Sequence, residues 1–247
     1  MFEKVEGIVL RTKDYGENNK IVTLYTREYG LISAVARGAK KSKSRMAAIT
    51  QPFIYGSFLV QMGRGLGTIH QGEILHSMRT IREDIVLTAY VSYICELLSK
   101  VVNEKEPNSN IFDELYVSLE RIIDGDSPLA ISIMFELKMY YVAGIAPVVD
   151  SCVNGHTERP VAAFSVYEGG VICDQCIYRS EDYIKITPQI YNVLKLMSQT
   201  SIKRIRNLNI KNETLKLIRD ILDHYYERFG GMPIKSKRFL DQIHLLE

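Results

Sequence analysis

The segment Arg37-Gly-Ala-Lys-Lys-Ser-Lys-Ser-Arg45 holds five cations and no anion, and it interrupts a region that otherwise consists of short strand-like runs. Runs rich in Val, Ile, Tyr, Phe and Thr lie on both sides of it, at residues 5–12, 21–26, 31–36, 53–61 and 68–75. Turn-forming residues separate these runs, at 15–19, 29–30 and 63–67. The pattern predicts five strands with one long basic connection between the third and the fourth. A small closed barrel fits this arrangement, and the OB-fold is the commonest five-stranded candidate.

The apolar period changes from residue 81 onward, where apolar residues recur every third or fourth position. One helical face carries Ile85, Ala89, Tyr93, Leu97 and Val101, and the neighbouring Cys95 is expected in the core. Three more helices are expected to begin at Asn110, at Ser127-Pro128 and at Asn212. The fold class is therefore an α+β multidomain chain. We expect an OB-fold nucleic-acid-binding domain over residues 1–80 and an all-α domain over residues 81–247.

A zinc-finger-like insertion is expected to interrupt the helical part at residues 148–180. It contains Cys152-Val-Asn-Gly-His156 and Cys173-Asp-Gln-Cys176, with a hairpin pattern between them. The CxxC spacing suits two ligands of a tetrahedral zinc ion, and a Cys/His pair can complete the site. A second CxxC is missing because position 155 is Gly, which leaves His156 as the candidate fourth ligand. Three readings stay open: a Cys₃His Zn²⁺ site, a metal-free loop with packed thiols, and a redox CxxC.

Charge is segregated along the chain. Residues 1–80 carry 12 Lys/Arg and 6 Asp/Glu, a net charge of +6, whereas residues 81–150 carry 5 and 12, a net charge of −7. A local excess of cations suits a polyphosphate partner, because each neutralised phosphate releases condensed counterions. The alternative is a solvated, mobile loop without a partner.

Cations and aromatic side chains lie on or beside the predicted strands, as in OB-folds that bind single-stranded nucleic acid. The aromatic candidates are Tyr15, Tyr25, Tyr29 and Tyr55, each of which is also a candidate for simple barrel packing. The Gly-rich stretch at 63–67 lies between two predicted strands, which favours a hairpin turn over a phosphate loop. The candidate DNA-binding residues are Arg11, Lys13, Lys20, Arg27, Arg37, Lys40, Lys41, Lys43, Arg45 and Arg64.

Several function classes find no support in the sequence. The chain has no GxxxxGK[ST], GxSxG or HExxH motif, so we expect no enzyme of those classes. No apolar run approaches the roughly 18 residues of a membrane span, and the N-terminus has no signal-peptide pattern. We therefore expect a cytoplasmic protein without a membrane partner, whose four cysteines are reduced or bind a metal.

Seven short motifs together resemble the RecO family of bacterial DNA repair proteins, and the likeness extends over essentially the whole chain. They are Gly7-Ile-Val-Leu-Arg-Thr-Lys-Asp-Tyr-Gly-Glu17, Leu24-Tyr-Thr-Arg-Glu-Tyr-Gly30, Ala36-Arg-Gly-Ala-Lys-Lys41, Ser44-Arg45, Gln51-Pro-Phe53, Arg64-Gly-Leu-Gly67 and Gly144-Ile-Ala-Pro147. The family combines an N-terminal OB-fold with a helical domain that carries a zinc-finger-like insertion, in agreement with the architecture expected above.

The resemblance implies a non-enzymatic recombination mediator, associated with the nucleoid. Such proteins bind single- and double-stranded DNA, anneal complementary strands, associate with RecR and contact the acidic C-terminal tail of single-strand-binding protein. Through these partners they assist the loading of RecA filaments. The family's basic positions carry over to Arg11, Lys13, Arg37, Lys40, Lys41, Lys43 and Arg45. Cys152, Cys173 and Cys176 match three of the four zinc ligands of four-cysteine members, and Gly155 departs from the fourth.

Two rival functions remain at this point. One is a protein-interaction scaffold whose basic loop binds an acidic protein rather than DNA. The other is a nuclease or another DNA enzyme, which would need a cluster of metal-binding carboxylates. The six acids of residues 1–80 are too few and too scattered to favour an enzyme.

Overall fold

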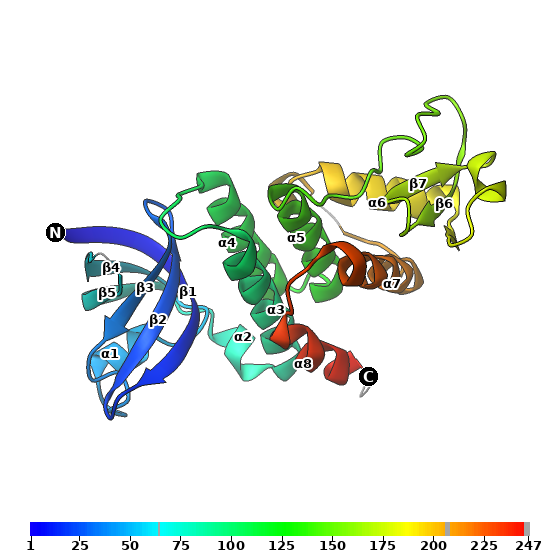
Figure 1. Cartoon of the computed structure of the whole chain (residues 1–247). Helices are drawn as coiled ribbons and strands as arrows, with labels where there is room; N and C mark the ends of the chain where they lie inside the picture. Colours follow the sequence, from blue (N-terminus) through cyan, green and yellow to red (C-terminus); the bar gives the residue numbers. More distant parts are fainter. Residues whose placement is uncertain (64, 206–207, 245–247) are drawn as a thin grey trace. The chain divides into compact units, whose positions relative to one another are not determined.

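The computed structural model describes residues 1–63, 65–205 and 208–244 (Figure 1). These residues form two compact units. The first, here called the barrel unit, comprises residues 1–128 and returns from residue 234 onward; the second, the helical unit, comprises residues 129–233. None of the helices in the described ranges is long and apolar enough to cross a membrane. The domain boundary expected at residue 80 stays a prediction.

Five strands close into a barrel in the order β1-β2-β3-β5-β4, which confirms the predicted five-stranded barrel. The pairs are antiparallel except β3 with β5. The strands are β1 (Phe2–Tyr15), β2 (Asn19–Thr26), β3 (Gly30–Ala36), β4 (Tyr55–Gln61) and β5 (Gly67–His76). Alternate residues fill the barrel, among them Val22, Leu24, Ile32, Ala34, Phe58 and Ile69. The short helix α1 (Arg45–Ile49) follows the basic segment, and Ile49 joins this core.

Four helices complete the barrel unit: α1, α2 (Arg79–Glu83), α3 (Ile85–Val101) and α4 (Ser109–Ile123), with α8 (Lys235–His244) added from the far end of the chain. The side chain of Asp84 caps α3, and that of Asn108 caps α4, so α4 starts slightly before the predicted Asn110. Cys95 is buried on α3, as expected. The carboxylate of Glu96 accepts hydrogen bonds from the backbone N–H groups of Lys235 and Ser236, which places the start of α8 beside α3.

The connection between α3 and α4 lies directly against the turn between β2 and β3. Gly30 has a φ of +63°, and a Cβ atom there would lie 2.2 Å from the carbonyl oxygen of Glu106. Leu31 and Glu104 form a parallel bridge, and the N–H of Lys105 donates to the carbonyl of Leu31 at 3.0 Å. Only glycine suits position 30, because it tolerates both the left-handed backbone and the close approach.

Aromatic side chains pack α4 against the barrel. The rings of Tyr25 and Tyr55 lie 6.2 and 6.1 Å from the ring of Phe112, and Tyr55 also lies 4.8 Å from Tyr116. Burial raises the pKa of Tyr25 to about 12. Tyr25 and Tyr55 therefore serve the packing of the barrel unit, whereas Tyr15 stays about half exposed at a strand end.

The helical unit consists of three longer helices and a small sheet. The helices are α5 (Pro128–Val142), α6 (Pro188–Gln199) and α7 (Asn212–Phe229), with short 3₁₀ turns η1 (Cys176–Tyr178) and η2 (Ile202–Arg204). The sheet has the order β7-β6-β8, from β6 (Val161–Ser165), β7 (Gly170–Cys173) and β8 (Ile184–Lys185). The hairpin β6–β7 confirms the predicted insertion between helices.

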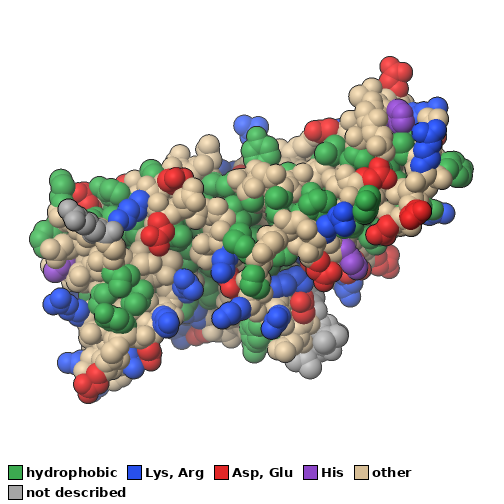
Figure 2. Space-filling model, in the orientation of Figure 1, with side chains coloured by type: hydrophobic (Ala, Val, Ile, Leu, Met, Phe, Trp, Pro, Cys, Tyr) green, Lys and Arg blue, Asp and Glu red, His purple; other side chains and the backbone are tan. Residues whose placement is uncertain are grey.

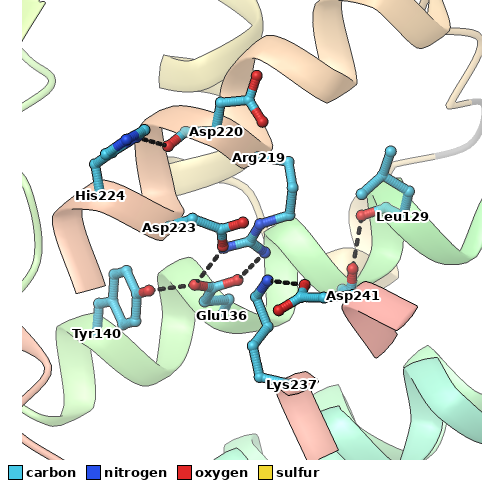
Figure 3. Close-up of polar contacts among 10 residues, drawn as sticks. Leu129, Glu136, Tyr140, Arg219, Asp220, Asp223, His224, Lys237 and Asp241 are labelled. Carbon is cyan, nitrogen blue, oxygen red and sulfur yellow. Dashed lines mark hydrogen bonds and ion pairs between the residues drawn. The ribbon is translucent and has the colours of Figure 1, made fainter. Parts of the chain in front are cut away.

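A buried charge network joins α5 to α7 (Figure 3). Glu136 is fully buried on α5, and the guanidinium of Arg219 on α7 donates to both of its carboxylate oxygens. The hydroxyl of Tyr140 donates to the same carboxylate, and Asp223 lies 2.7 Å from Arg219. Removing one member of such a buried ion pair destabilises the fold strongly, because the other charge stays buried without its partner.

We expect Glu136→Ala to lower the free energy of unfolding by about 3–5 kcal/mol, because it leaves the Arg219 charge buried with a weaker set of partners. The double variant Glu136→Leu with Arg219→Met should recover most of this loss. Urea unfolding followed by circular dichroism measures both. The control is Glu83→Gln at the exposed pair with Arg79, which should cost less than about 0.5 kcal/mol. Equal costs at Glu136 and Glu83 would contradict the structural role.

Candidate nucleic-acid interface and metal centre

The basic segment folds onto the turn between β1 and β2. The N–H of Lys40 donates to the carbonyl of Asn18 at 3.1 Å, and the N–H of Gly38 donates to the side-chain oxygen of Asn19 at 3.0 Å. The ammonium of Lys40 also lies 3.0 Å from the carboxylate of Asp14. These contacts bring two cationic stretches, about 20 residues apart in sequence, to the same end of the barrel.

The strand register shows which side chains share the outer face of the barrel. Lys13 pairs with Ile21, which pairs with Val35, which pairs with Thr68, so these four residues form one row across β1, β2, β3 and β5. Paired residues point to the same side of a sheet. The inward positions of these strands are filled by the core, so this row lies outside. The outer face thus has a cation at one edge and half-buried apolar side chains in its middle.

A second row on the same face runs parallel to the first, through Arg11, Thr23 and Ser33. Arg11 and Lys13 are both exposed on β1. Since neighbouring strands lie about 5 Å apart, Ser33 is about 10 Å from Arg11 along this row. In OB-folds this face of strands 2 and 3 is where oligonucleotides bind.

Most of the predicted cations gather at these two places. Arg37, Lys40, Lys41, Lys43 and Arg45 are exposed in or beside the connection from β3 to α1, and Lys20 is partly buried next to it. Lys and Arg side chains lie on the face of the molecule that Figure 2 shows. Arg64 lies outside the described residues. Every one of these assignments to DNA stays a prediction.

Arg27 differs from the other predicted cations, because its guanidinium already has partners on α4. One nitrogen lies 2.8 Å from the carboxylate of Asp113, and the guanidinium carbon lies 4.5 Å from the centre of the Phe112 ring. This geometry combines an ion pair with a cation–π contact. The structure thus gives Arg27 a role in holding α4 against the barrel.

The second candidate site is a cluster of Cys152, His156, Cys173 and Cys176, whose ligand atoms all lie within 4.8 Å of one another. The Cys152 and Cys176 sulfurs are 3.7 Å apart, and His156 Nδ1 lies 3.4 and 3.3 Å from the sulfurs of Cys173 and Cys176. Zinc–sulfur and zinc–nitrogen bonds of about 2.3 and 2.0 Å imply tetrahedral ligand separations of roughly 3.5–3.8 Å. The three cysteines are buried and His156 is half-buried. The cluster can hold a metal ion, and the donor set suits zinc.

The local backbone explains this convergence. β7 ends at Cys173 and η1 starts at Cys176, so the CxxC forms the tight turn that follows the hairpin. Gly155, with a φ of +83°, lets the chain turn after Cys152, and its N–H donates to the Cys152 carbonyl at 2.9 Å. This turn brings His156 beside Cys173 and Cys176, where it can serve as a fourth ligand.

The hydrogen bonds at the CxxC turn, residues 173–176, favour the thiolate form of Cys173. Burial alone would raise the pKa of its thiol, but bonds from the backbone N–H groups of Cys176 and Gln175, and a bond with His156, lower it to about 6. Burial and the neighbouring thiols of Cys152 and Cys173 instead raise the pKa of Cys176 to about 11. A cation is the natural neutralising partner for such a set of sulfurs.

One part of the surface near the barrel was not expected from the sequence. Glu104 and Lys105, on the connection between α3 and α4, line a pocket together with the glycine-rich turn between β4 and β5. They lie in the acidic middle part of the chain, where no motif marks them. The φ of Lys105, +62°, is the one feature that sets it apart, and it is visible only in the structure.

An OB-fold barrel with gathered cations, followed by helices that carry a Cys/His cluster, defines a two-part protein with a zinc-finger-like insertion. Comparison with known proteins agrees. The family model described as "Recombination protein O N terminal" matches residues 1–78, and "Recombination protein O C terminal" matches residues 82–238. The chain belongs to the Recombination protein O family.

Several curated relatives are similar over nearly the whole chain. The chain is 46% identical over 243 residues to "DNA repair protein RecO" of Bacillus mycoides, which covers 98% of this chain and 98% of that protein. The proteins of the same name from Bacillus subtilis and Oceanobacillus iheyensis are also 46% identical over 98% of this chain, with 95% and 94% of their own lengths covered.

We expect Arg27→Ala to destabilise the barrel unit by about 1 kcal/mol, the size of a partly exposed cation–π contact with an ion pair. A thermal unfolding midpoint lowered by a few degrees would show this. Arg27→Lys should recover only part of the loss, because an ammonium lacks the planar face that stacks on Phe112. Unchanged midpoints for both variants would mean that the contact with α4 does not stabilise the fold.

Proposed function

We propose that this chain binds single- and double-stranded DNA through the cationic end and the outer face of its barrel, and that it acts as a recombination mediator in DNA repair. The observation that carries the proposal is the gathering of exposed cations from β1 and from the β3–α1 connection at one end of an OB-fold barrel. Membership in a family of recombination proteins supports the role in repair.

The mechanism that we propose is electrostatic rather than catalytic. Cations that contact phosphates lower the repulsion between two complementary strands and leave the base edges free, so the protein would anneal strands without a nucleotide cofactor. It would act as a binding protein and not as an enzyme. By the family resemblance, its protein partners would be RecR and the C-terminal tail of single-strand-binding protein, with RecA filaments assisted indirectly. Its place would be at the nucleoid in the cytoplasm.

The basic connection can be tested by charge removal. Replacing Lys40, Lys41, Lys43 and Arg45 with Ala should weaken DNA binding evenly across sequences and flatten its dependence on salt by about 0.7–0.9 per lost phosphate contact. Fluorescence anisotropy of labelled single and double strands at several salt concentrations measures both. Annealing of complementary oligonucleotides by the same variant should slow in parallel, with no effect of added ATP.

The matched control removes four exposed cations from the helical unit: Arg179, Lys185, Lys211 and Lys216. It changes the net charge equally and should alter the salt dependence much less. A larger effect of this control would place the DNA interface in the helical unit. Affinity for DNA that is negligible at physiological salt in the unmodified protein would favour the rival scaffold, with an acidic protein as partner.

The Cys/His cluster is proposed to hold one Zn²⁺ as a structural ion, with Cys152, His156, Cys173 and Cys176 as its four ligands. A bound zinc ion would stabilise the insertion, because closed four-ligand sites contribute directly to folding. The three buried thiols and the tetrahedral spacing support this over a redox pair. The role that we propose for the ion is structural support of the insertion rather than contact with DNA.

Elemental analysis should find about one zinc ion per chain. His156→Ala should lower the occupancy and allow faster loss of zinc to a chelator, because three ligands hold a structural ion less firmly. The control is His224→Ala, another histidine of the helical unit that lies outside the cluster. Full occupancy after His156→Ala would identify another fourth ligand. A metal-free protein with an ordered hairpin would point to a site held by packing alone.

A further inference from the structure

A pocket of about 260 Å³ lies at the edge of the barrel's outer face. Its apolar lining comes from Ile32, Met62 and Leu66, and its polar lining from Ser33, Glu104 and Lys105. The remaining lining comes from Gly63 and Gly65, between β4 and β5, and from Gly67 at the start of β5. The volume is slightly below the roughly 300–1,000 Å³ of sites for whole small molecules, which suits a single planar fragment.

The pocket is continuous with the proposed DNA-binding face. Ser33 lines the pocket and belongs to the row that begins at Arg11. The distance between these two residues is about two strand spacings, or about 10 Å, which is less than the length of two extended nucleotides in a strand lying across the face. A DNA strand whose phosphates contact Arg11 and Lys13 therefore reaches the pocket within its next few nucleotides.

The backbone at Lys105 is a second, independent observation. Its φ of +62° lies in the left-handed region, which glycine and asparagine occupy at much lower cost than lysine. Its N–H donates to Leu31, and its ammonium donates to the carbonyl of Gly63 at 3.2 Å across the pocket rim. Residues held in sparsely populated backbone conformations cluster at active sites and ligand-binding sites.

From these observations we infer that the pocket holds one unstacked nucleobase of single-stranded DNA, and that Lys105 contacts the adjoining phosphate. The inference rests on the proposed function, because it needs a DNA strand on the outer face. The flat base would lie against Met62 and Leu66, whose flexible thioether and apolar side chains suit an aromatic ring. Glu104 disfavours a phosphate inside the pocket and can accept a hydrogen bond from the exocyclic amine of cytosine, adenine or guanine.

Gly65 belongs to the lining of the pocket, so a side chain added there alters that lining. A Cβ atom at this position meets no heavy atom within 4 Å. The experiment compares an oligo-dC strand with a strand of equal length in which abasic sites replace all bases. Both strands carry the same phosphates, so any difference between them reports contacts with bases.

Gly65→Leu should weaken binding of oligo-dC by about two- to tenfold, the range of thioether and apolar contacts with one ring. It should leave the affinity for the abasic strand unchanged, and Gly65→Ala should give a smaller effect in the same direction. Equal affinities of the unmodified protein for the two strands would overturn the inference and leave phosphate binding intact. Binding of neither strand would overturn the proposed function itself. Equal weakening of both strands by Gly65→Leu would also count against a base pocket.

Lys105→Gly tests the second contact and separates binding from folding. Glycine removes the backbone strain, so the thermal midpoint should stay equal or rise, while the affinity for both strands falls because a phosphate contact is lost. Lys216→Ala is the matched control, since it removes one exposed cation of the helical unit. A lowered thermal midpoint with unchanged affinity for DNA would mean that Lys105 stabilises the fold, and it would overturn the assignment of Lys105 to DNA.

Discussion

The packing of α4 and its preceding connection against the barrel is the contact on which the barrel unit depends. Gly30 meets the backbone of Glu106 where no side chain fits, and Phe112 lies between Tyr25, Tyr55 and the guanidinium of Arg27. These contacts cover one side of the closed barrel. In the rows of the outer face, Arg11 and Lys13 stay exposed on β1, whereas Thr23, in the row of Arg11, is buried.

Much of this arrangement could be predicted from the sequence, because strand alternation and helical periodicity are local. The five strands and the helices α3, α4, α5 and α7 follow from such patterns, and the metal cluster follows from cysteine spacing. The helices α1, α2 and α8 could not, since each has at most ten residues, too few for a helical period to repeat clearly. Thr187 and Pro188 are a sequence signal for the start of α6, because a capping threonine followed by proline is typical of a helix N-terminus.

Side-chain partners were the least predictable part, because they join residues far apart in the chain. Arg27 is an arginine beside a predicted strand, which is why the sequence suggests a DNA contact. In the structure its guanidinium pairs with Asp113, 86 residues later in the chain. Glu136 sits within an apolar helix whose other buried positions are mostly hydrophobic, and only the structure supplies Arg219 as its partner. The pocket beside Lys105 likewise needs a strand turn and a helix connection that no local pattern links.

The barrel unit is built from both ends of the chain, and this has a consequence for its synthesis. Helix α8 packs along α3 and is anchored at Glu96, but it follows the whole helical unit in sequence. A nascent chain emerges at about 5–20 residues per second, so the part of α3 that contacts α8 stays uncovered for several seconds or more while residues 129–233 are made. During that interval the barrel can close, but the unit as a whole cannot finish folding. Ribosome-bound chains that end before residue 234 would therefore expose the α8-binding surface of α3, to which chaperones can bind.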